Sequence, residues 1–380
     1  MSHYDYIIVG AGASGLLLAD ALGSDDFFTS KSILLIDKAK KVQNDRTWCF
    51  WEAGEGTFDH LLLKSWPKIY FAGKDLRLST SIAPYIYKML RGIEFYTYFN
   101  QRIKSYTNIT RIQEEVTAVN ELEKHVEVAT KNNTYQGHIV FNSMFSYDSL
   151  PQQKKYPVLQ QHFLGWFIKV EKPTFNAEEA TFMDFSIPQK GNTRFMYVLP
   201  FSETEALFEY TLFSEEVLEK SEYENAIKDY LEEHYQNLSY TITEKEQGSI
   251  PMTAYPFHQK NTDTHMYIGI AGGWAKPSTG FTFYSTSKKV KKLVEYLKQS
   301  KPLSRFHKKD KFWFYDMLLL DVIFKNNHLG QSIFESLFTK RKASLILKFL
   351  DEDTSLWEDV KMMSSPKAIP FVKALLGRIF

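Results

Sequence analysis

The chain has 380 residues, more than the roughly 250–300 at which a single hydrophobic core stops growing, so at least two packed regions are expected. Hydrophobic residues make up 44% of the sequence and charged residues 24%, which excludes a largely disordered or fibrous protein. Because 46 Lys and Arg are balanced by 45 Asp and Glu, no global charge favours nucleic acid as a partner. Cys49 is the single cysteine, which excludes an internal disulfide and fits a reducing cytoplasm.

The first 158 residues predict most of a nucleotide-binding domain. A short apolar strand over 6–9, a glycine-rich turn, a helix over 16–22 and a second strand over 33–36 form a βαβ unit. The elements expected after it are an aromatic strand over 68–71, a helix over 82–90, and short strands over 114–119 and 138–141.

The middle of the chain predicts an antiparallel sheet that is covered on one face. Strand-like runs lie at 163–170, 194–199 and 206–213, with a helix near 223–234. Residues 267–273 are again small and apolar, like those near the N-terminus. The sheet is therefore expected to be inserted into a discontinuous domain.

The predicted fold is therefore α/β, with three parts. A discontinuous Rossmann-like domain is expected over 1–65, 82–158 and 256–300. An inserted antiparallel-sheet substrate domain is expected over 66–81 and 159–255, and a C-terminal helical region over 301–380.

The C-terminal region differs from the rest in charge. Residues 1–285 carry 27 Lys and Arg against 35 Asp and Glu, whereas residues 286–380 carry 19 against 10. Apolar stretches over 313–324 and 368–380 suit amphipathic helices on an anionic lipid surface, although a solvated helical subdomain is the alternative. Neither a signal peptide nor a membrane span of about 18 apolar residues is expected.

Gly10, Gly12 and Gly15 form a Gly-x-Gly-x-x-Gly motif between the first strand and the first helix. Glycines at these places permit a tight turn, the approach of backbone amides to a pyrophosphate, and close packing of helix on strand. Asp37 ends the second strand, where a carboxylate accepts hydrogen bonds from ribose hydroxyls. The predicted dinucleotide-binding residues are Gly10, Ala11, Gly12, Ala13, Ser14, Gly15 and Asp37.

A second glycine-rich segment, over 269–280, resembles the late flavin-contacting motif of hydroxylase-type flavoproteins, so FAD is expected rather than NAD. Such proteins usually carry Gly-Asp-Ala there, with the Asp holding a ribityl hydroxyl. Ile270 stands at the Asp position here, so ribityl recognition is expected to differ, and an ordinary redox role is less favoured.

Further motifs follow the glycine motif in order. They are Arg46-Thr-Trp-Cys-Phe-Trp51, Phe163-x-Gly165, Met183-Asp184-Phe185, Phe195-x-Tyr197-x-x-Pro200-Phe201-Ser202, Leu207-Phe-Glu-Tyr-Thr211, Glu246-x-Gly248-x-Ile250-Pro251-Met252 and Pro277-Ser-Thr-Gly-Phe281. In this order they resemble the motifs of the bacterial and plant-type lycopene cyclases, flavoproteins that close β-ionone rings on linear carotenoids. The resemblance covers the whole chain. It adds to the expected FAD-binding residues Arg46, Val116, Gly273, Pro277, Thr279 and Gly280.

The resemblance also implies a catalytic acid. In the family the first glutamate of a Phe-Leu-Glu-Glu-Thr motif is implicated in acid catalysis, and it matches Glu209; Tyr210 replaces the second glutamate. Cyclisation needs a proton donor, stabilisation of a tertiary carbocation and a base, without net redox change. Desolvation in an apolar pocket would raise the pKa of Glu209 and keep it protonated. The alternative is an exposed strand glutamate.

Asp184 is the second catalytic candidate, since it could orient a proton or relay it to the flavin or to Glu209. The alternative is an aspartate that caps the turn before Pro188. No close histidine cluster and no Gly-x-Ser-x-Gly motif occurs, so neither a metal site nor triad hydrolysis is expected.

The expected function is that of a lycopene β-cyclase, which converts lycopene or related linear carotenoids through γ-carotene to β-carotene. The resemblance implies that reduced FAD is the active form and that NAD(P)H is the reductant. The protein is expected in the cytoplasm, associated peripherally with the inner face of the membrane. Two alternatives stay open: a redox flavoprotein acting on an isoprenoid lipid, such as a geranylgeranyl reductase or a monooxygenase, and a non-catalytic carotenoid-binding flavoprotein.

Overall fold

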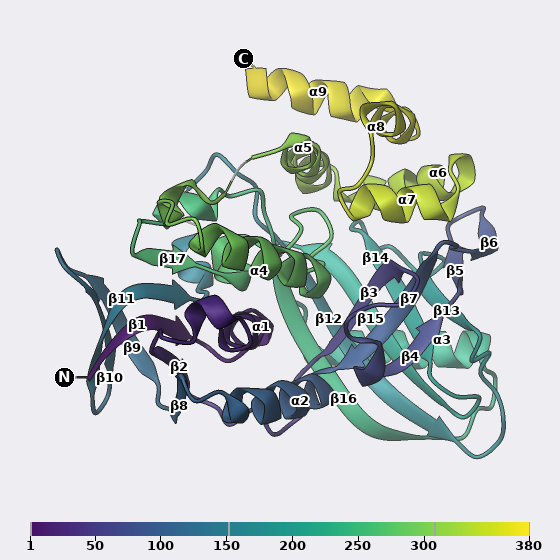
Figure 1. The fold of residues 1–380 in the computed structure, drawn as a ribbon. Coiled ribbons are helices and arrows are strands. Elements are labelled where there is room, and N and C mark those ends of the chain that lie inside the picture. Colours follow the sequence, from purple (N-terminus) through teal and green to yellow (C-terminus); the bar gives the residue numbers. More distant parts are fainter. Residues whose placement is uncertain (1, 151–152, 308, 380) are drawn as a thin grey trace.

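The computed structural model describes residues 2–150, 153–307 and 309–379, and its chain forms three sheets and a group of C-terminal helices (Figure 1). Sheet 1 has the strand order β8-β2-β1-β11-β10-β9, with β17 beside β11. Its strands are β1 (Ser2–Val9), β2 (Ile33–Asp37), β8 (Ile109–Gln113), β9 (Val116–Glu121), β10 (Val126–Thr130), β11 (Thr134–Asn142) and β17 (His265–Tyr267). Because β17 joins strands from the first 142 residues, the predicted discontinuity is confirmed.

Both faces of sheet 1 are covered, which explains the continuous apolar run in β1. Ile8 packs with the helices α1 (Ala13–Gly23), α2 (Gly92–Ser105) and α4 (Phe283–Leu297). Ile7 points to the opposite face, where it is buried in a cluster with apolar residues of β10 and β11 from the same sheet. The parallel strands β8, β2, β1 and β11 end at one common edge, where α1 begins.

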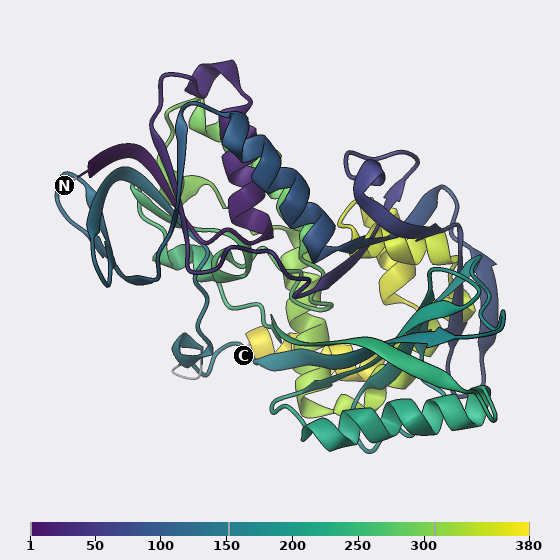
Figure 2. The same cartoon turned by 90° about the horizontal axis from the view of Figure 1, so that it is seen from below.

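Sheet 2 is the inserted, mainly antiparallel sheet, with the strand order β16-β12-β15-β14-β13-β5-β6. Its strands are β5 (Lys68–Ala72), β6 (Arg77–Ser81), β12 (Leu159–Val170), β13 (Glu179–Asp184), β14 (Arg194–Pro200), β15 (Glu205–Ser214) and β16 (Tyr240–Met252). The predicted helix near 223–234 is α3 (Lys220–His234), which buries Tyr223, Ile227 and Leu231 against one face of the sheet (Figure 2).

Sheet 3 consists of β3 (Thr47–Ala53), β7 (Tyr85–Arg91) and β4 (Leu62–Trp66). The helix predicted over 82–90 is wrong, because β7 lies between β3 and β4 and pairs with both. Tyr87 and Met89 are buried there against sheet 2, so tertiary pairing overrides the helix-like spacing of the apolar residues. The exact domain boundaries stay a prediction.

The C-terminal region is helical, as predicted, and packs over the face of sheet 2 opposite α3 (Figures 1 and 2). Its helices are α5 (Lys311–Lys325), α6 (Gly330–Lys340), α7 (Ala343–Leu350), α8 (Leu356–Met363) and α9 (Ala368–Ile379). Among the described residues, every helix is too short or too polar to cross a bilayer.

Candidate active site

The glycine turn fits a dinucleotide. Gly10 has φ +96°, and a Cβ on Gly15 would lie 1.8 Å from the Gly10 carbonyl oxygen, so helix and strand approach too closely for a side chain. A Cβ on Gly12 would meet no atom within 4 Å, and no side chain caps the start of α1. The open space in front of the helix N-terminus is therefore suited to a phosphate group.

Asp37 lies beside this turn at the end of β2. Its carboxylate accepts hydrogen bonds from the backbone N–H of Ala11 and of Ala39, each at 2.6 Å. Gln113, the last residue of β8, pairs with Asp37. Val116 begins β9 three residues later, so it lies near the same edge of sheet 1. Arg46 precedes β3 and forms an ion pair with Asp45 at 3.2 Å. Their roles toward a cofactor stay predictions.

The segment over 269–280 connects the glycine turn with sheet 2. A Cβ on Gly269 would lie 2.6 Å from Ser14 Oγ, which places this segment against the start of α1. A Cβ on Gly280 would lie 3.0 Å from Gln161 Oε1 of β12. Gly273 has φ +68° and Gly280 φ +70°, conformations that favour glycine. The path from Gly269 to Gly280 thus runs from the glycine turn to sheet 2.

Thr279 adds evidence that this segment faces a ligand. Its hydroxyl oxygen is buried and has no hydrogen-bond partner among the described residues. Buried polar groups are nearly always paired, so an orphaned hydroxyl at this place fits a ligand that carries polar groups. The open space at Gly12 fits the pyrophosphate of FAD, and Thr279, which also lines the apolar cavity described below, offers its hydroxyl where the two meet.

Gly12→Val is expected to abolish FAD retention while leaving the fold intact, because the valine side chain fills only the space in front of α1. The measurement is the flavin absorbance of the purified protein together with its melting temperature. Gly377→Val is the matched control, since a Cβ on Gly377 also meets no atom within 4 Å. Full flavin content in the Gly12 variant would show that the dinucleotide lies elsewhere.

Two carboxyl groups meet at the centre of sheet 2. Gly165 of β12 pairs with Glu209 of β15 on one side and with Glu246 of β16 on the other. Directly paired residues project from the same face, and glycine places no side chain between them. A Cβ on Gly165 would lie 3.2 Å from Glu246 Cγ and 3.5 Å from Glu209 Cβ. The two carboxyl groups are hydrogen-bonded to each other across this gap.

The two carboxyl groups hold protons differently. Burial raises the pKa of Glu209 well above its usual range, and the charge of Glu246 raises it further. Burial also raises the pKa of Glu246, to about 7, but the Thr47 hydroxyl donates to Glu246 Oε2 at 2.7 Å and favours its ionised form. Thr211 donates to Glu209 Oε1 at 3.0 Å. The pair therefore holds its shared proton mainly on Glu209, a suitable acid beside a suitable base.

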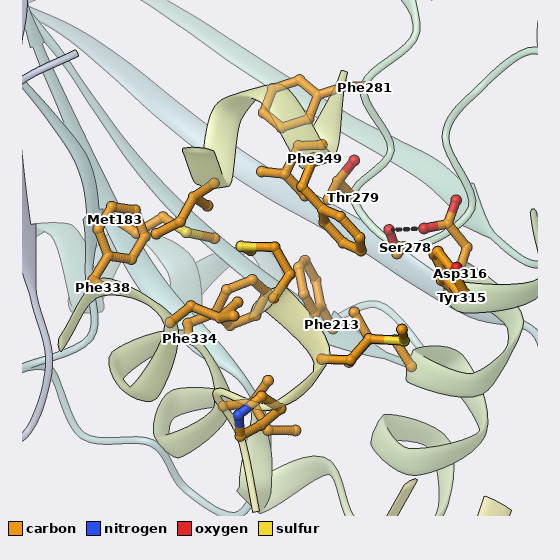
Figure 3. A pocket seen from close by; sticks show the side chains of 18 of the residues that line it. Met183, Phe213, Ser278, Thr279, Phe281, Tyr315, Asp316, Phe334, Phe338 and Phe349 are labelled. Carbon is orange, nitrogen blue, oxygen red and sulfur yellow. Dashed lines mark hydrogen bonds between the residues drawn. The ribbon is translucent and has the colours of Figure 1, made fainter. Parts of the chain in front are cut away.

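An apolar cavity leads to this pair. It lies between sheet 2 and the C-terminal helices, and aromatic side chains form much of its wall (Figure 3). Examples are Phe195, Phe213, Phe281, Phe334 and Phe338. Tyr197 also lines the cavity and pairs with Glu209 on the neighbouring strand, so one end of the cavity lies next to the carboxyl pair.

The structure does not bring Asp184 to Glu209. Asp184 Oδ1 accepts hydrogen bonds from the backbone N–H of Ser186 at 2.8 Å and from its hydroxyl, and Oδ2 accepts from the Tyr230 hydroxyl of α3 at 2.9 Å. The carboxylate thus faces α3, on the side of sheet 2 away from the carboxyl pair. This geometry matches the turn-capping alternative and contradicts a relay between Asp184 and Glu209.

Tyr210 lies on that same outer face. Its hydroxyl accepts a hydrogen bond from Arg194 at 2.9 Å, and its ring packs against α3. Adjacent strand residues point to opposite faces, so a glutamate at position 210 would lie on the face of sheet 2 away from Glu209. The second carboxylate of the site is instead Glu246, a residue of the Glu246-x-Gly248 motif for which the sequence predicts no role.

A Rossmann-like domain joined to a large, mainly antiparallel sheet is a fold that this chain shares with solved flavoproteins. More specifically, the chain belongs to the lycopene cyclase protein family, whose family model matches residues 5–376. The resemblance noted from the sequence motifs is thereby confirmed. No curated protein matches the sequence.

Solved structures share the fold at low sequence identity. A geranylgeranyl bacteriochlorophyll reductase-like protein from Thermoplasma acidophilum is 12% identical, with a TM-score of 0.63 and 99% of both chains covered. A flavoprotein/dehydrogenase from Cytophaga hutchinsonii is 12% identical, with a TM-score of 0.61 and coverage of 100% of this chain and 99% of that one. The flavin-dependent brominase Bmp2 is 15% identical, with a TM-score of 0.56 and 99% of both chains covered.

Proposed function

We propose that this protein is a lycopene β-cyclase, which closes the ends of lycopene into β-rings to give γ-carotene and β-carotene. The observation that carries the proposal is the Glu209–Glu246 carboxyl pair beside one end of an aromatic cavity. A long hydrocarbon fits an apolar wall, and an acid paired with a base fits a reaction that adds one proton and removes another.

The chemistry balances without a change in composition. Glu209 donates its proton to the terminal double bond of the substrate, and the tertiary carbocation that results is attacked by a second double bond, which closes the ring. Glu246, ionised, removes a ring proton and leaves the β-ring double bond. The hydrogen bond between the two carboxyl groups returns the proton to Glu209, so the cycle restarts without a co-substrate.

The residues around the pair support the cation and exclude water. The face of an aromatic ring attracts a cation by about 0.5–2 kcal/mol, and Tyr197 is the residue paired with Glu209 on the adjoining strand. The cavity wall offers few polar atoms that could hold water, which would capture the cation as an alcohol. The cavity thus favours ring closure over hydration.

FAD would be held by the glycine turn, Asp37 and the segment over 269–280. Reduced FAD bound there would supply an electron-rich ring system that favours positive charge nearby, and it would not be consumed. NAD(P)H is the proposed reductant. We also propose that the protein works in the cytoplasm, associated peripherally with a membrane that holds its apolar substrate.

Expression in a host that accumulates lycopene tests the function. The expected product is β-carotene or γ-carotene, with a mass equal to that of lycopene, because cyclisation is an isomerisation. A product with added hydrogen or oxygen would instead support a redox enzyme acting on an isoprenoid lipid. Unchanged lycopene that copurifies with the protein would support a carotenoid-binding role.

A further inference from the structure

The last two helices present an unpartnered apolar face to solvent. Trp357 of α8 is 76% exposed and Ile369 of α9 is 70% exposed. The complete set of large exposed apolar side chains on these helices is Leu356, Trp357, Val360, Met363, Ile369, Val372 and Leu376, which we call the α8–α9 face. Figure 1 shows both helices as the outermost layer beyond α5, α6 and α7. An apolar patch of this size usually marks a binding surface.

The α8–α9 face is held in a fixed orientation by contacts on its inner side. Met362 and Ala374 are buried against the C-terminal helices. Asp359 is buried and forms an ion pair with Lys311 at 2.7 Å. Arg378 of α9 donates to both carboxylate oxygens of Asp321 of α5, at 2.6 and 2.7 Å. The outward apolar side chains therefore belong to helices that specific contacts hold in place.

The charges around the face are positive. Lys361, Lys367 and Lys373 are exposed and form no ion pair within the described residues. The acidic residues of α8 are neutralised, since Glu358 pairs with Lys348 and Asp359 with Lys311. Apolar side chains flanked by free lysines match the interface of an anionic bilayer, to which each lysine near the surface is attracted.

The same face reaches the substrate cavity. Met363 is 45% exposed and also lines the cavity, and Met362, Pro366 and Phe371 line it nearby. The lining also includes Tyr197, which pairs with Glu209 on the neighbouring strand. The cavity thus has in its wall both a residue of the exposed α8–α9 face and the strand partner of Glu209.

We propose that the α8–α9 face docks onto an anionic lipid surface and that the cavity then opens directly into the apolar layer of the membrane. This inference rests on the proposed function in one respect, namely that the ligand is a membrane-dissolved hydrocarbon. A carotenoid end group would enter past Met363 and reach Glu209 without crossing water. Lipid binding itself follows from the face alone and can be tested without any turnover.

The test uses the full-length FAD-loaded protein and vesicles of phosphatidylcholine with or without phosphatidylglycerol, separated by sedimentation. Trp357→Ser/Ile369→Ser is expected to lower the partition coefficient on anionic vesicles by tenfold or more, because two large apolar side chains are then no longer buried in lipid. Leu122→Ser/Val217→Ser is the matched control, since Leu122 and Val217 are also exposed but lie elsewhere. The control is expected to bind as the wild type does.

Salt and lysine substitutions test the charge component. Lys361→Gln/Lys367→Gln/Lys373→Gln is expected to weaken binding to anionic vesicles by about fivefold per lysine and to leave binding to neutral vesicles unchanged. Equal binding of wild type and both variant sets would overturn the proposal. So would a wild-type dimer in light scattering that Trp357→Ser/Ile369→Ser dissociates, because the face would then join two copies of the chain.

A second readout separates this proposal from the proposed function. Lycopene is supplied either in anionic vesicles or in detergent micelles. Trp357→Ser/Ile369→Ser is expected to lose turnover from vesicles and to keep it from micelles, where docking is not needed. If neither the wild type nor the variant converted lycopene in either medium, but vesicle binding were as expected, the proposed function would be contradicted. The docking surface would still be supported. Equal turnover from vesicles by variant and wild type would overturn delivery through this face.

Discussion

Glu209→Gln is expected to slow ring formation by about 10²–10⁴-fold, the usual contribution of a general acid, with folding and FAD binding intact. Glutamine keeps the shape and the hydrogen bonds to Thr211 and Glu246 but has no proton to transfer. The deciding assay is anaerobic, with chemically reduced FAD and lycopene, so that reduction by a nicotinamide nucleotide does not limit the rate.

Two further variants make that result specific. Glu209→Asp keeps an acid but withdraws it by about one methylene, so a smaller loss is expected if reach matters. Glu203→Gln is the control, because Glu203 is an exposed residue next to the same strand and its substitution removes a carboxylate without touching the cavity. Ring formation at nearly the wild-type rate in Glu209→Gln would move the acid to Glu246 or to the reduced flavin.

The dinucleotide site could be predicted from the sequence because its determinants are local. The spacing of Gly10, Gly12 and Gly15 between a strand and a helix fixes a turn within one short segment, and Asp37 follows in the adjacent strand. The discontinuous domain was also predictable, since the apolar pattern of residues 267–273 repeats that of the first strand. Local patterns of this kind can be recognised in a sequence even when the pairing of the strands is unknown.

The carboxyl pair could not be predicted in full, because it depends on strand register. Glu246 lies beside Glu209 because Gly165 of β12 is paired with both residues. The register of strands so far apart in the chain is fixed by tertiary packing. Alternation along β15 does place Tyr210 on the face opposite Glu209, and this signal was available from the sequence. Asp184 likewise depends on register, which sets it beside α3.

The proposed entry of substrate from lipid is consistent with the raised pKa of Glu209. Burial raises this pKa, and the cavity next to the carboxyl pair is lined mainly by carbon. An aqueous entrance would solvate the carboxyl group and lower its pKa toward the usual range. A route from lipid thus preserves the acid that the chemistry requires.

Glu246→Gln is expected to remove the base and to slow ring formation by about 10²-fold or more. It should also change the pH profile. In the wild type, activity is expected to rise with pH as Glu246, with a pKa of about 7, loses its proton, and to fall at higher pH as Glu209 loses its own. The rise through pH 7 is expected to disappear in the variant, and single-turnover rates from pH 5 to pH 9 measure this directly.

The same variant should alter the pH dependence of stability. The pKa of Glu246 is about 7 in the folded protein against an ordinary value of 4.5, so the folded state binds more protons between these values than the unfolded state. The free energy of unfolding of the wild type therefore falls as pH rises through this window, by about 3 kcal/mol from this residue. Glu246→Gln cannot titrate, and its stability should fall by correspondingly less from pH 5 to pH 8. Urea unfolding at pH 5 and pH 8 measures this difference, with Glu203→Gln as the control. If the wild type and Glu246→Gln lost the same free energy of unfolding, Glu246 would not be a buried group with a raised pKa. The proposed roles of Glu209 as acid and Glu246 as base would then also be wrong.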